Sequence, residues 1–200
     1  IIKLMKKLTK DRIKILFEES IKAKEKCIIQ GFDSIYLMGE KIADAIENGN
    51  KMMLCGNGGS AADAQHLAAE FLIRLRPKVN RHPIPAISLC TDTSMLTACG
   101  NDYKFEDIFL RPFKALSKKN DILLAISTSG NSKNIIKVLN QAKKDKITTI
   151  GFLGNNGGKA KKFCNYKIVV DSKNTARTQE AHIFLGHFIF TSVEDLVLKS

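Results

Sequence analysis

The chain has 200 residues, and its 44% hydrophobic and 26% charged residues are typical of a folded globular protein and exclude a disordered one. No uninterrupted apolar run reaches the roughly 20 residues needed to cross a bilayer, so we expect no membrane partner. The net charge of +12 comes from dispersed lysines, which predicts a solvated basic surface that attracts anionic small molecules and argues against nucleic acid as a partner.

The first part of the chain is helical in pattern. Residues 9–29 and 31–48 carry apolar side chains at helical spacing, which predicts two amphipathic helices, and Gly49 ends the second. Each apolar face needs a cover, either from the rest of the domain or from another subunit.

After residue 49, short apolar segments alternate with helix-like segments. The predicted strands are 51–56, 84–91, 121–127, 148–154 and 166–171. The predicted helical segments are 60–75, 93–100, 105–117, 132–144, 158–163 and 175–199. This alternation predicts an α/β fold with a doubly wound, five-stranded parallel sheet of flavodoxin-like type. We expect one domain over residues 1–200, in which 1–48 serve packing and oligomerisation and 49–200 form the α/β core.

The cysteines are scattered, and no Cys-x-x-Cys pair occurs, so the sequence indicates neither a zinc knuckle nor a redox motif. Isolated cysteines are typical of small buried side chains in a reducing compartment, which predicts a cytoplasmic protein. The five are Cys27, Cys55, Cys90, Cys99 and Cys164.

The segment "GNGGSA" follows the first strand of the core and begins a helix. Gly56, Gly58 and Ala61 match a Gly-x-Gly-x-x-Ala dinucleotide fingerprint, but the acidic residue expected about 20 positions later is missing. A P-loop lysine is missing as well, so we expect no nucleotide cofactor. The segment is then a glycine turn with Ser60 as N-cap, whose free amides bind anions or sugar hydroxyls. A plain tight turn is the alternative.

The segment "AISTSGNSKN" places hydroxyl groups at another strand-to-helix junction. Ser127, Thr128, Ser129 and Ser132 surround Gly130. Four hydroxyls and the amides of a helix start can together bind one phosphate, whereas simple N-capping needs only one hydroxyl. The pattern therefore predicts a phosphate-binding loop.

Two further segments carry acid–base groups. His66 and Glu70 stand four apart on a predicted helix, so they share one face and suit metal binding or proton transfer; an ordinary surface pair is the alternative. On the last helix, His187 lies among apolar residues, which is also the pattern of a core histidine. Gln179 lies about two turns earlier on the same helix, and His182 competes with His187 for the same role.

Taken together, these motifs closely resemble the phosphoheptose isomerases within the sugar isomerase (SIS) fold. The similarity runs from about residue 30 to the C-terminus. It rests on "CGNGGSAADAQHLAAE", "PAISLCTDTSMLTACGNDY", "DILLAISTSGNSKNI" and "TARTQEAHIFLGH".

The resemblance implies a site and an assembly. The implied substrate-binding residues are Asn57, Gly58, Gly59, Ser60, Glu70, Asn101, Asp102, Ser127, Thr128, Ser129, Ser132 and Gln179. The implied Zn²⁺ ligands are His66, Glu70, Gln179 and His187, and Glu70 and His187 match the catalytic acid–base pair. The family forms homotetramers with active sites at subunit interfaces, which would cover the N-terminal apolar faces.

The implied activity is the isomerisation of sedoheptulose 7-phosphate to an aldose through an enediol. Glu70 would carry the proton between C1 and C2, His187 would shuttle protons at the two oxygens, and Zn²⁺ would act as a Lewis acid. The chain departs from its relatives at Ile73, where they usually have Gly. We expect this stretch to border the far end of the sugar or a subunit contact.

Two alternatives remain open at this point. A non-enzymatic SIS-fold regulator, which associates with a bacterial replication initiator, shares much of the loop pattern. By resemblance, it lacks the acidic residue at position 70 and the histidine at position 187, both present here. The other alternative is an isomerase or sensor of a hexose or amino-sugar phosphate, which the Ile73 departure leaves open.

Overall fold

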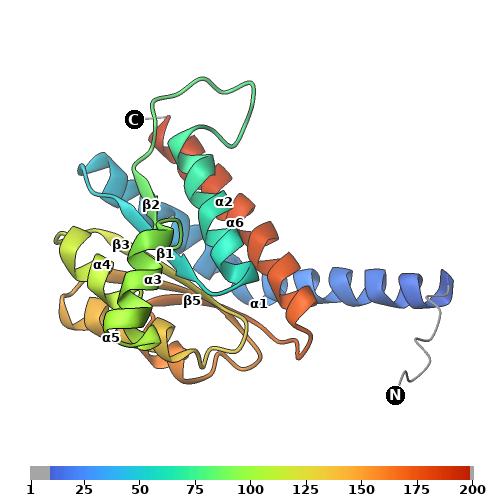
Figure 1. Cartoon of the computed structure of the whole chain (residues 1–200). Helices are drawn as coiled ribbons and strands as arrows, with labels where there is room; N and C mark the ends of the chain where they lie inside the picture. Colours follow the sequence, from blue (N-terminus) through green and yellow to red (C-terminus); the bar gives the residue numbers. More distant parts are fainter. Residues whose placement is uncertain (1–9, 199–200) are drawn as a thin grey trace, which may run out of the picture.

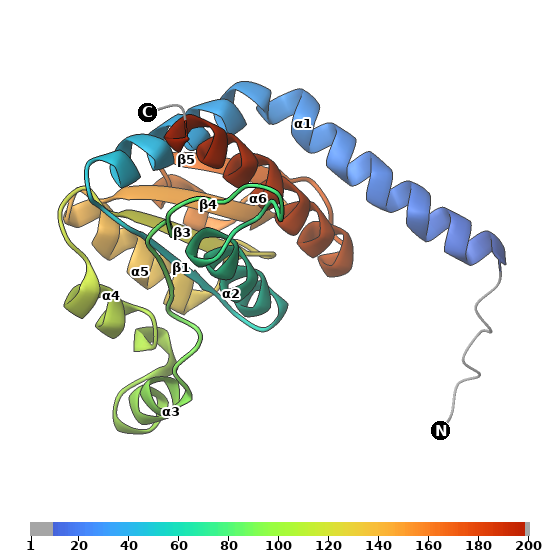
Figure 2. The same cartoon turned by 90° about the horizontal axis from the view of Figure 1, so that it is seen from above.

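The computed structural model describes residues 10–198. Its first element is one continuous helix, α1 (Lys10–Glu47). The prediction of two separate helices is therefore wrong. Gly31 does not interrupt α1, because an internal glycine costs a helix only about 1 kcal/mol, whereas a proline would break it. In Figures 1 and 2 the first half of α1 projects beyond the rest of the molecule, and the second half packs on α6 and β5.

The sheet is the predicted one. It contains β1 (Met52–Gly56), β2 (Ala86–Ser88), β3 (Ile122–Ser127), β4 (Thr148–Gly154) and β5 (Tyr166–Val170), all parallel, in the order β2-β1-β3-β4-β5. This is the doubly wound, flavodoxin-like order, and its strand order reverses between β1 and β3. Strand β2 is shorter than expected because it is an edge strand that begins only after Pro85, which has no N–H group to donate.

Helices cover both faces of the sheet. The α-helices after α1 are α2 (Gly59–Leu72), α3 (Thr93–Asp102), α4 (Leu110–Leu116), α5 (Lys133–Lys144) and α6 (Thr175–Val197), with 3₁₀ turns at Phe105–Asp107 and Lys159–Phe163. α2 and α6 pack together beside α1 on one face, whereas α5 packs on β3 and β4 with α4 beside it. Within residues 10–198, no helix has the length and apolar character to cross a membrane.

In the central strands, buried and exposed side chains do not alternate. Every residue of β1 and β3 is buried, as expected for parallel strands covered on both faces. The five cysteines are all buried and none forms a disulfide, which confirms the prediction of small buried side chains.

The helices α2 and α6 lie side by side and run in the same direction. Gly59 faces Gln179, Leu67 packs against Gly186, and the rings of Phe71 and Phe190 stack with centroids 3.8 Å apart. Each pair lies further along both helices than the one before it. A residue on α2 therefore meets a residue at a matching level of α6.

Candidate functional site

The loop after β1 lies at the carboxyl edge of the sheet, where strand order reverses. Gly58 is the N-cap of α2 and has a φ of 56°, a left-handed conformation that favours glycine. The prediction of Ser60 as N-cap is wrong, because Ser60 lies inside the first turn of α2 and is buried. No side chain caps this helix, so its first amides face the loop without a side-chain acceptor.

Gly59 and Gln179 touch where α2 and α6 begin. A Cβ atom on Gly59 would collide with the Gln179 carboxamide, so only glycine fits this position without a shift. The contact places Gln179 at the glycine loop. It lies about 12 Å along α6 from His187, because eight residues of helix separate them. Gln179 therefore lies at the predicted substrate loop, about two turns before His187 on the same helix.

The loop after β1 and the loop after β3 are joined by two asparagines. Asn57 Nδ2 donates to Asn134 Oδ1 at 3.0 Å, and Asn134 Nδ2 donates to Asn57 Oδ1 at 2.8 Å. Asn134 is buried at the start of α5, and its Oδ1 also accepts from the Ile135 amide. Sequence reasoning missed Asn134, although "SGNSKN" places it directly after the hydroxyl-rich loop. With its carboxamide held in this way, Asn57 offers a substrate chiefly its backbone.

The hydroxyl-rich loop after β3 folds around Gly130. Gly130 has a φ of 63°, and its amide donates to Ser127 Oγ at 3.1 Å. Ser127 Oγ lies 3.4 Å from Ser132 Oγ, and Ser129 Oγ accepts from the Asn131 amide at 3.1 Å. Ser132 is the N-cap of α5 but makes no side-chain capping bond. The structure thus brings the Ser127 and Ser132 hydroxyls together at the start of α5, while a joint phosphate site of all four hydroxyls stays a prediction.

His66, Glu70 and His187 come together where α2 passes α6. The Nε2 atoms of His66 and His187 lie 2.8 Å apart, and His66 Nε2 lies 3.6 Å from Glu70 Oε1. One imidazole must donate to the other, so one Nε2 carries the proton and the other a lone pair. The side chains of His66 and Glu70 are 44% and 20% exposed, which leaves room for a ligand to reach them.

His187 is placed to accept protons. Partial burial lowers its pKa below the ordinary histidine value, the positive charge of a protonated His66 lowers it further, and Glu70 acts in the opposite direction. His187 is therefore neutral at pH 7 and able to take up a proton. His182 competes with it in the sequence, but it is fully buried beside Phe152, on the side of α6 that faces the sheet.

Burial lowers the pKa of His182 from 6.5 to about 4. The unfolded chain binds a proton at this residue below about pH 6.5 and the folded chain does not, so we expect stability to fall as the pH drops from 6.5 to 4, by about 3 kcal/mol in total. Urea unfolding of His182→Met across this range should show a flatter pH dependence than wild type. The exposed His82→Gln should behave as wild type. A constant difference between His182→Met and wild type at every pH would contradict the prediction.

The donor types of the His66–Glu70–His187 cluster suit Zn²⁺, which takes imidazole nitrogens and carboxylate oxygens. The positions of these three side chains do not suit a zinc ion. Nitrogen ligands on one tetrahedral zinc lie about 3.3 Å apart, whereas these two nitrogens are at hydrogen-bonding distance. Over residues 10–198, no three His, Cys, Asp or Glu side chains are grouped to hold a metal ion.

Asn101 and Asp102 lie at the end of α3, and both are exposed. Asn101 Nδ2 donates to Asp102 Oδ1 at 2.9 Å. Asp102 borders an apolar hollow between α3 and α4. Among the hydrogen bonds of the described chain, none joins either residue to the two loops. Their part in substrate binding remains a prediction.

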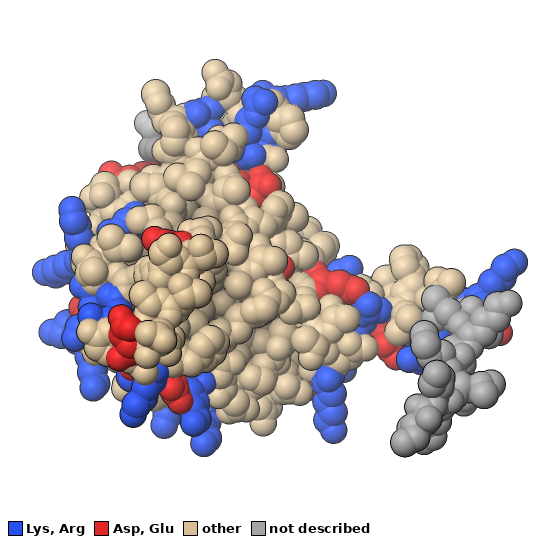
Figure 3. Space-filling view, viewed as in Figure 1, with Lys and Arg blue, Asp and Glu red and all other residues tan. Residues whose placement is uncertain are grey.

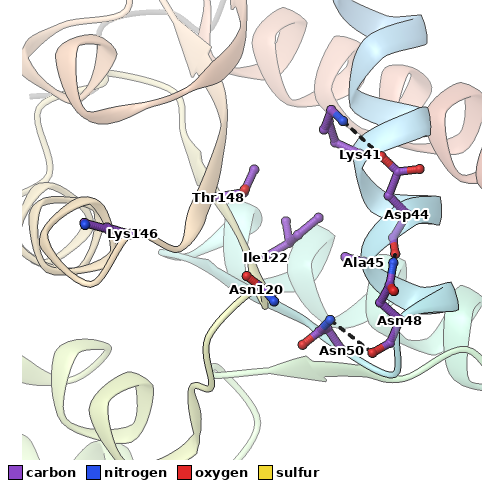
Figure 4. Close-up of a pocket in the computed structure, with 9 residues that line it drawn as sticks. All are labelled: Lys41, Asp44, Ala45, Asn48, Asn50, Asn120, Ile122, Lys146 and Thr148. Carbon is purple, nitrogen blue, oxygen red and sulfur yellow. Dashed lines mark hydrogen bonds and ion pairs between the residues drawn. The ribbon is translucent and has the colours of Figure 1, made fainter.

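Two hollows help to locate the site. A cavity of about 200 Å³ opens beside Asn57 and Gly58 and is closed by apolar side chains such as Phe105 and Phe109. A polar hollow of about 420 Å³ lies at the opposite edge, where β3 and β4 begin at Ile122 and Thr148 (Figure 4). Ligands of doubly wound sheets bind at the carboxyl edge, so the first hollow belongs to the candidate site and the second does not.

The fold and the site together define a class of protein. The SIS domain family matches residues 17–154, which include the whole stretch from β1 to the end of β4. The glycine loop, the hydroxyl-rich loop and the His66–Glu70 pair all lie within this match.

The relatives narrow the class. Phosphoheptose isomerases of Clostridium acetobutylicum and Aquifex aeolicus are 46% and 47% identical, over 92% and 94% of this chain and 94% and 98% of theirs. The structure of the Neisseria gonorrhoeae phosphoheptose isomerase matches with a TM-score of 0.86 at 37% identity, over 92% of this chain and 98% of that one. This chain belongs to the phosphoheptose isomerase family.

Proposed function

We propose that the protein is an aldose–ketose isomerase that converts sedoheptulose 7-phosphate to D-glycero-D-manno-heptose 7-phosphate, the first step towards nucleotide-activated heptose for surface polysaccharide. The relatives' names give the substrate class. The observation that carries the reaction type is the meeting of Glu70 and His187 through His66, because isomerisation needs a carboxylate and an imidazole within reach of two adjacent carbons.

The phosphate is bound by the loop after β3. Ser127, Thr128, Ser129 and Ser132 belong to the loop that leads into α5, and the N-cap Ser132 makes no side-chain bond to the helix amides, of which Ile135 already donates to Asn134 Oδ1. A dianionic phosphate is stabilised there by hydroxyl groups, amides and the positive end of the helix. The Asn57–Asn134 pair fixes this loop against the glycine loop, which binds the sugar hydroxyls near Gln179.

The proton transfers balance without a co-reactant. Glu70 removes a proton from C1 of the ketose, the C–H electron pair forms the C1–C2 double bond, and the π pair of the C2 carbonyl moves to O2, which gives the enediolate. Neutral His187 takes the proton of the O1 hydroxyl and delivers it to O2. The carbonyl then forms at C1, and Glu70 returns its proton to C2. Both groups end in their starting protonation state, as a catalyst requires.

The test is NMR of the protein with sedoheptulose 7-phosphate in D₂O. We expect an aldoheptose 7-phosphate with deuterium at C2, because the carboxyl proton of Glu70 exchanges with solvent before it returns. Fructose 6-phosphate serves as the matched six-carbon control and should turn over far more slowly. Faster turnover of the hexose would contradict the heptose assignment, and no aldose from either sugar would favour a regulatory binding protein.

Zn²⁺ is the metal that we propose for this site, with His66, Glu70 and His187 as ligands once the two imidazole nitrogens move apart from hydrogen-bonding distance, and with Gln179 as a fourth candidate. When bound, it would stabilise negative charge on the sugar oxygens as a Lewis acid. Support comes from the donor types alone. Zinc content after dialysis, compared between wild type and His66→Ala, tests it: equal content in both would contradict this site.

We also propose a cytoplasmic homotetramer whose active sites lie at subunit interfaces. Large apolar side chains remain exposed along α1 and on the neighbouring face of α6, namely Ile13, Ile15, Phe17, Ile21, Ile29, Phe32, Tyr36, Leu37 and Phe188. The centre of the face in Figure 3 is mostly uncharged, with lysines and arginines around it. The cavity beside Asn57 is also below the roughly 300 Å³ of a small ligand site, as expected if a neighbouring subunit completes it. Sedimentation should give the mass of four chains.

A further inference from the structure

Glu194 is a buried carboxylate that the proposed reaction does not use. It lies on α6, seven residues after His187, and its side chain is 1% exposed. Arg81 Nε donates to Glu194 Oε1 at 2.6 Å, and Arg76 Nε donates to Glu194 Oε2 at 2.5 Å. A buried carboxylate needs such partners, because leaving its charge unpaired away from water is costly.

Arg81 also binds the end of α2. Its Nη2 donates to the Glu70 carbonyl oxygen at 2.7 Å, and its Nη1 donates to the Phe71 carbonyl oxygen at 2.9 Å. These carbonyls belong to the last turn of α2. Because the helix ends there, no following turn supplies backbone amides to donate to them. A cation at this end also complements the negative end of the helix dipole. The guanidinium group of Arg81, whose side chain is only 3% exposed, therefore acts as the cap of α2.

The same guanidinium group thus links two helices. On α2 it holds the backbone of Glu70, and on α6 it holds the carboxylate two turns beyond His187. Next to these attachments in the chain, Phe71 of α2 and Phe190 of α6 stack on each other. Because Arg is planar and rigid, its bonds to the Glu70 and Phe71 carbonyls and to the Glu194 carboxylate together fix how far α2 extends along α6.

We propose that Arg81, held by Glu194, is a positioning residue that sets the level of Glu70 on α2 relative to His187 on α6. The inference rests on the proposed function, in which these two groups share the proton transfers. Arg81 itself does not contact the reacting atoms. Its effect passes through the backbone of Glu70, where a displacement of about 1 Å is enough to slow a reaction by up to about 100-fold.

Arg76 provides a matched control within the chain. It binds the same carboxylate, but its other partner is the exposed Asp195 rather than the backbone of α2. Its side chain is 33% exposed, so replacing it removes less buried side-chain surface than replacing Arg81 does. If Arg81 served stability alone, substitutions of Arg81 and Arg76 would change kcat to a similar extent. If Arg81 positions Glu70, its substitution lowers kcat much more than that of Arg76.

The experiment compares Arg81→Lys with Arg76→Lys, each in the full chain. Lysine keeps the charge beside Glu194 but cannot bind both carbonyls and the carboxylate at once. For Arg81→Lys we expect kcat to fall about 10-fold or more, with KM within about twofold, since the phosphate loop is untouched. For Arg76→Lys we expect kcat within about twofold of wild type.

A second readout does not depend on activity. The imidazole ¹H–¹⁵N signals of His66 and His187 report their mutual hydrogen bond, so they should shift in Arg81→Lys and not in Arg76→Lys. Equal kcat and equal signals in the two variants would overturn the proposal, as would failure of Arg81→Lys to fold. An inactive wild type with signals that shift only in Arg81→Lys would reject the proposed reaction and retain the positioning of Glu70.

Discussion

Replacing Glu70 by Gln is expected to lower kcat about 1000-fold, the largest effect that we predict. Gln has nearly the same shape, and its side-chain oxygen still faces His66, but an amide cannot accept the C1 proton. Proton transfer by a positioned side chain typically contributes 10²- to 10⁴-fold, and here one carboxylate serves both carbons. Because Glu70 is partly exposed and its side chain pairs with His66 alone among residues 10–198, the fold should persist.

Deuterium uptake tests this prediction more directly than turnover, because it reports removal of the carbon-bound proton itself. In D₂O, the Glu70→Gln variant should leave both the ketose C1 protons and the aldose C2 proton unexchanged over the time in which wild type reaches equilibrium. Glu47→Gln, at the exposed end of α1, is the control and should exchange like wild type. Rapid exchange in Glu70→Gln would show that another group removes the proton.

Replacing His187 by Gln is expected to lower kcat about 100-fold or more, which is the second large effect that we predict. Gln can hydrogen-bond to a sugar oxygen but cannot move a proton from O1 to O2. Since enediol formation by Glu70 does not need that shuttle, C1 exchange in D₂O should continue while aldose formation falls. This split between exchange and conversion distinguishes His187 from Glu70.

The pH profile tests the same group. Burial, with the charge of His66, lowers the pKa of His187 below 6.5, and the shuttle starts from its neutral form. Wild-type kcat/KM should therefore stay level from pH 8 down to 6.5 and decline only at lower pH. His82→Gln, an exposed histidine, should leave this profile unchanged. A decline that begins well above pH 6.5 would contradict the assignment.

Much of the fold follows from the sequence because parallel strands and amphipathic helices leave regular patterns. The strand segments predicted the sheet, and the hydroxyl-rich segment around Gly130 does form the junction between β3 and α5, where Ser127 and Ser132 approach each other. The spacing of His66 and Glu70 predicted a shared helix face, and the structure adds His187 to it. These features are determined by residues close together in the sequence, and such residues leave periodic patterns and fixed spacings that can be recognised.

The features that the sequence did not predict are pairings between distant side chains. Asn57 with Asn134 and Arg81 with Glu194 are 77 and 113 positions apart, and neither pair leaves a periodic pattern. The position of Gln179 beside Gly59 depends on how two helices align, which spacing along one helix does not contain. The first helix was divided wrongly at residue 30, whereas the structure has one helix from Lys10 to Glu47.

The pairing of α2 with α6 has a consequence for the newly made chain. His66 and His187 are 121 positions apart, and α6 follows all five strands in the chain. A ribosome-bound chain that has completed β1 to β5 already contains Glu70 and His66, but it lacks His187. On the proposed mechanism, we expect such a chain to be unable to convert its substrate until α6 leaves the ribosome and docks on α2.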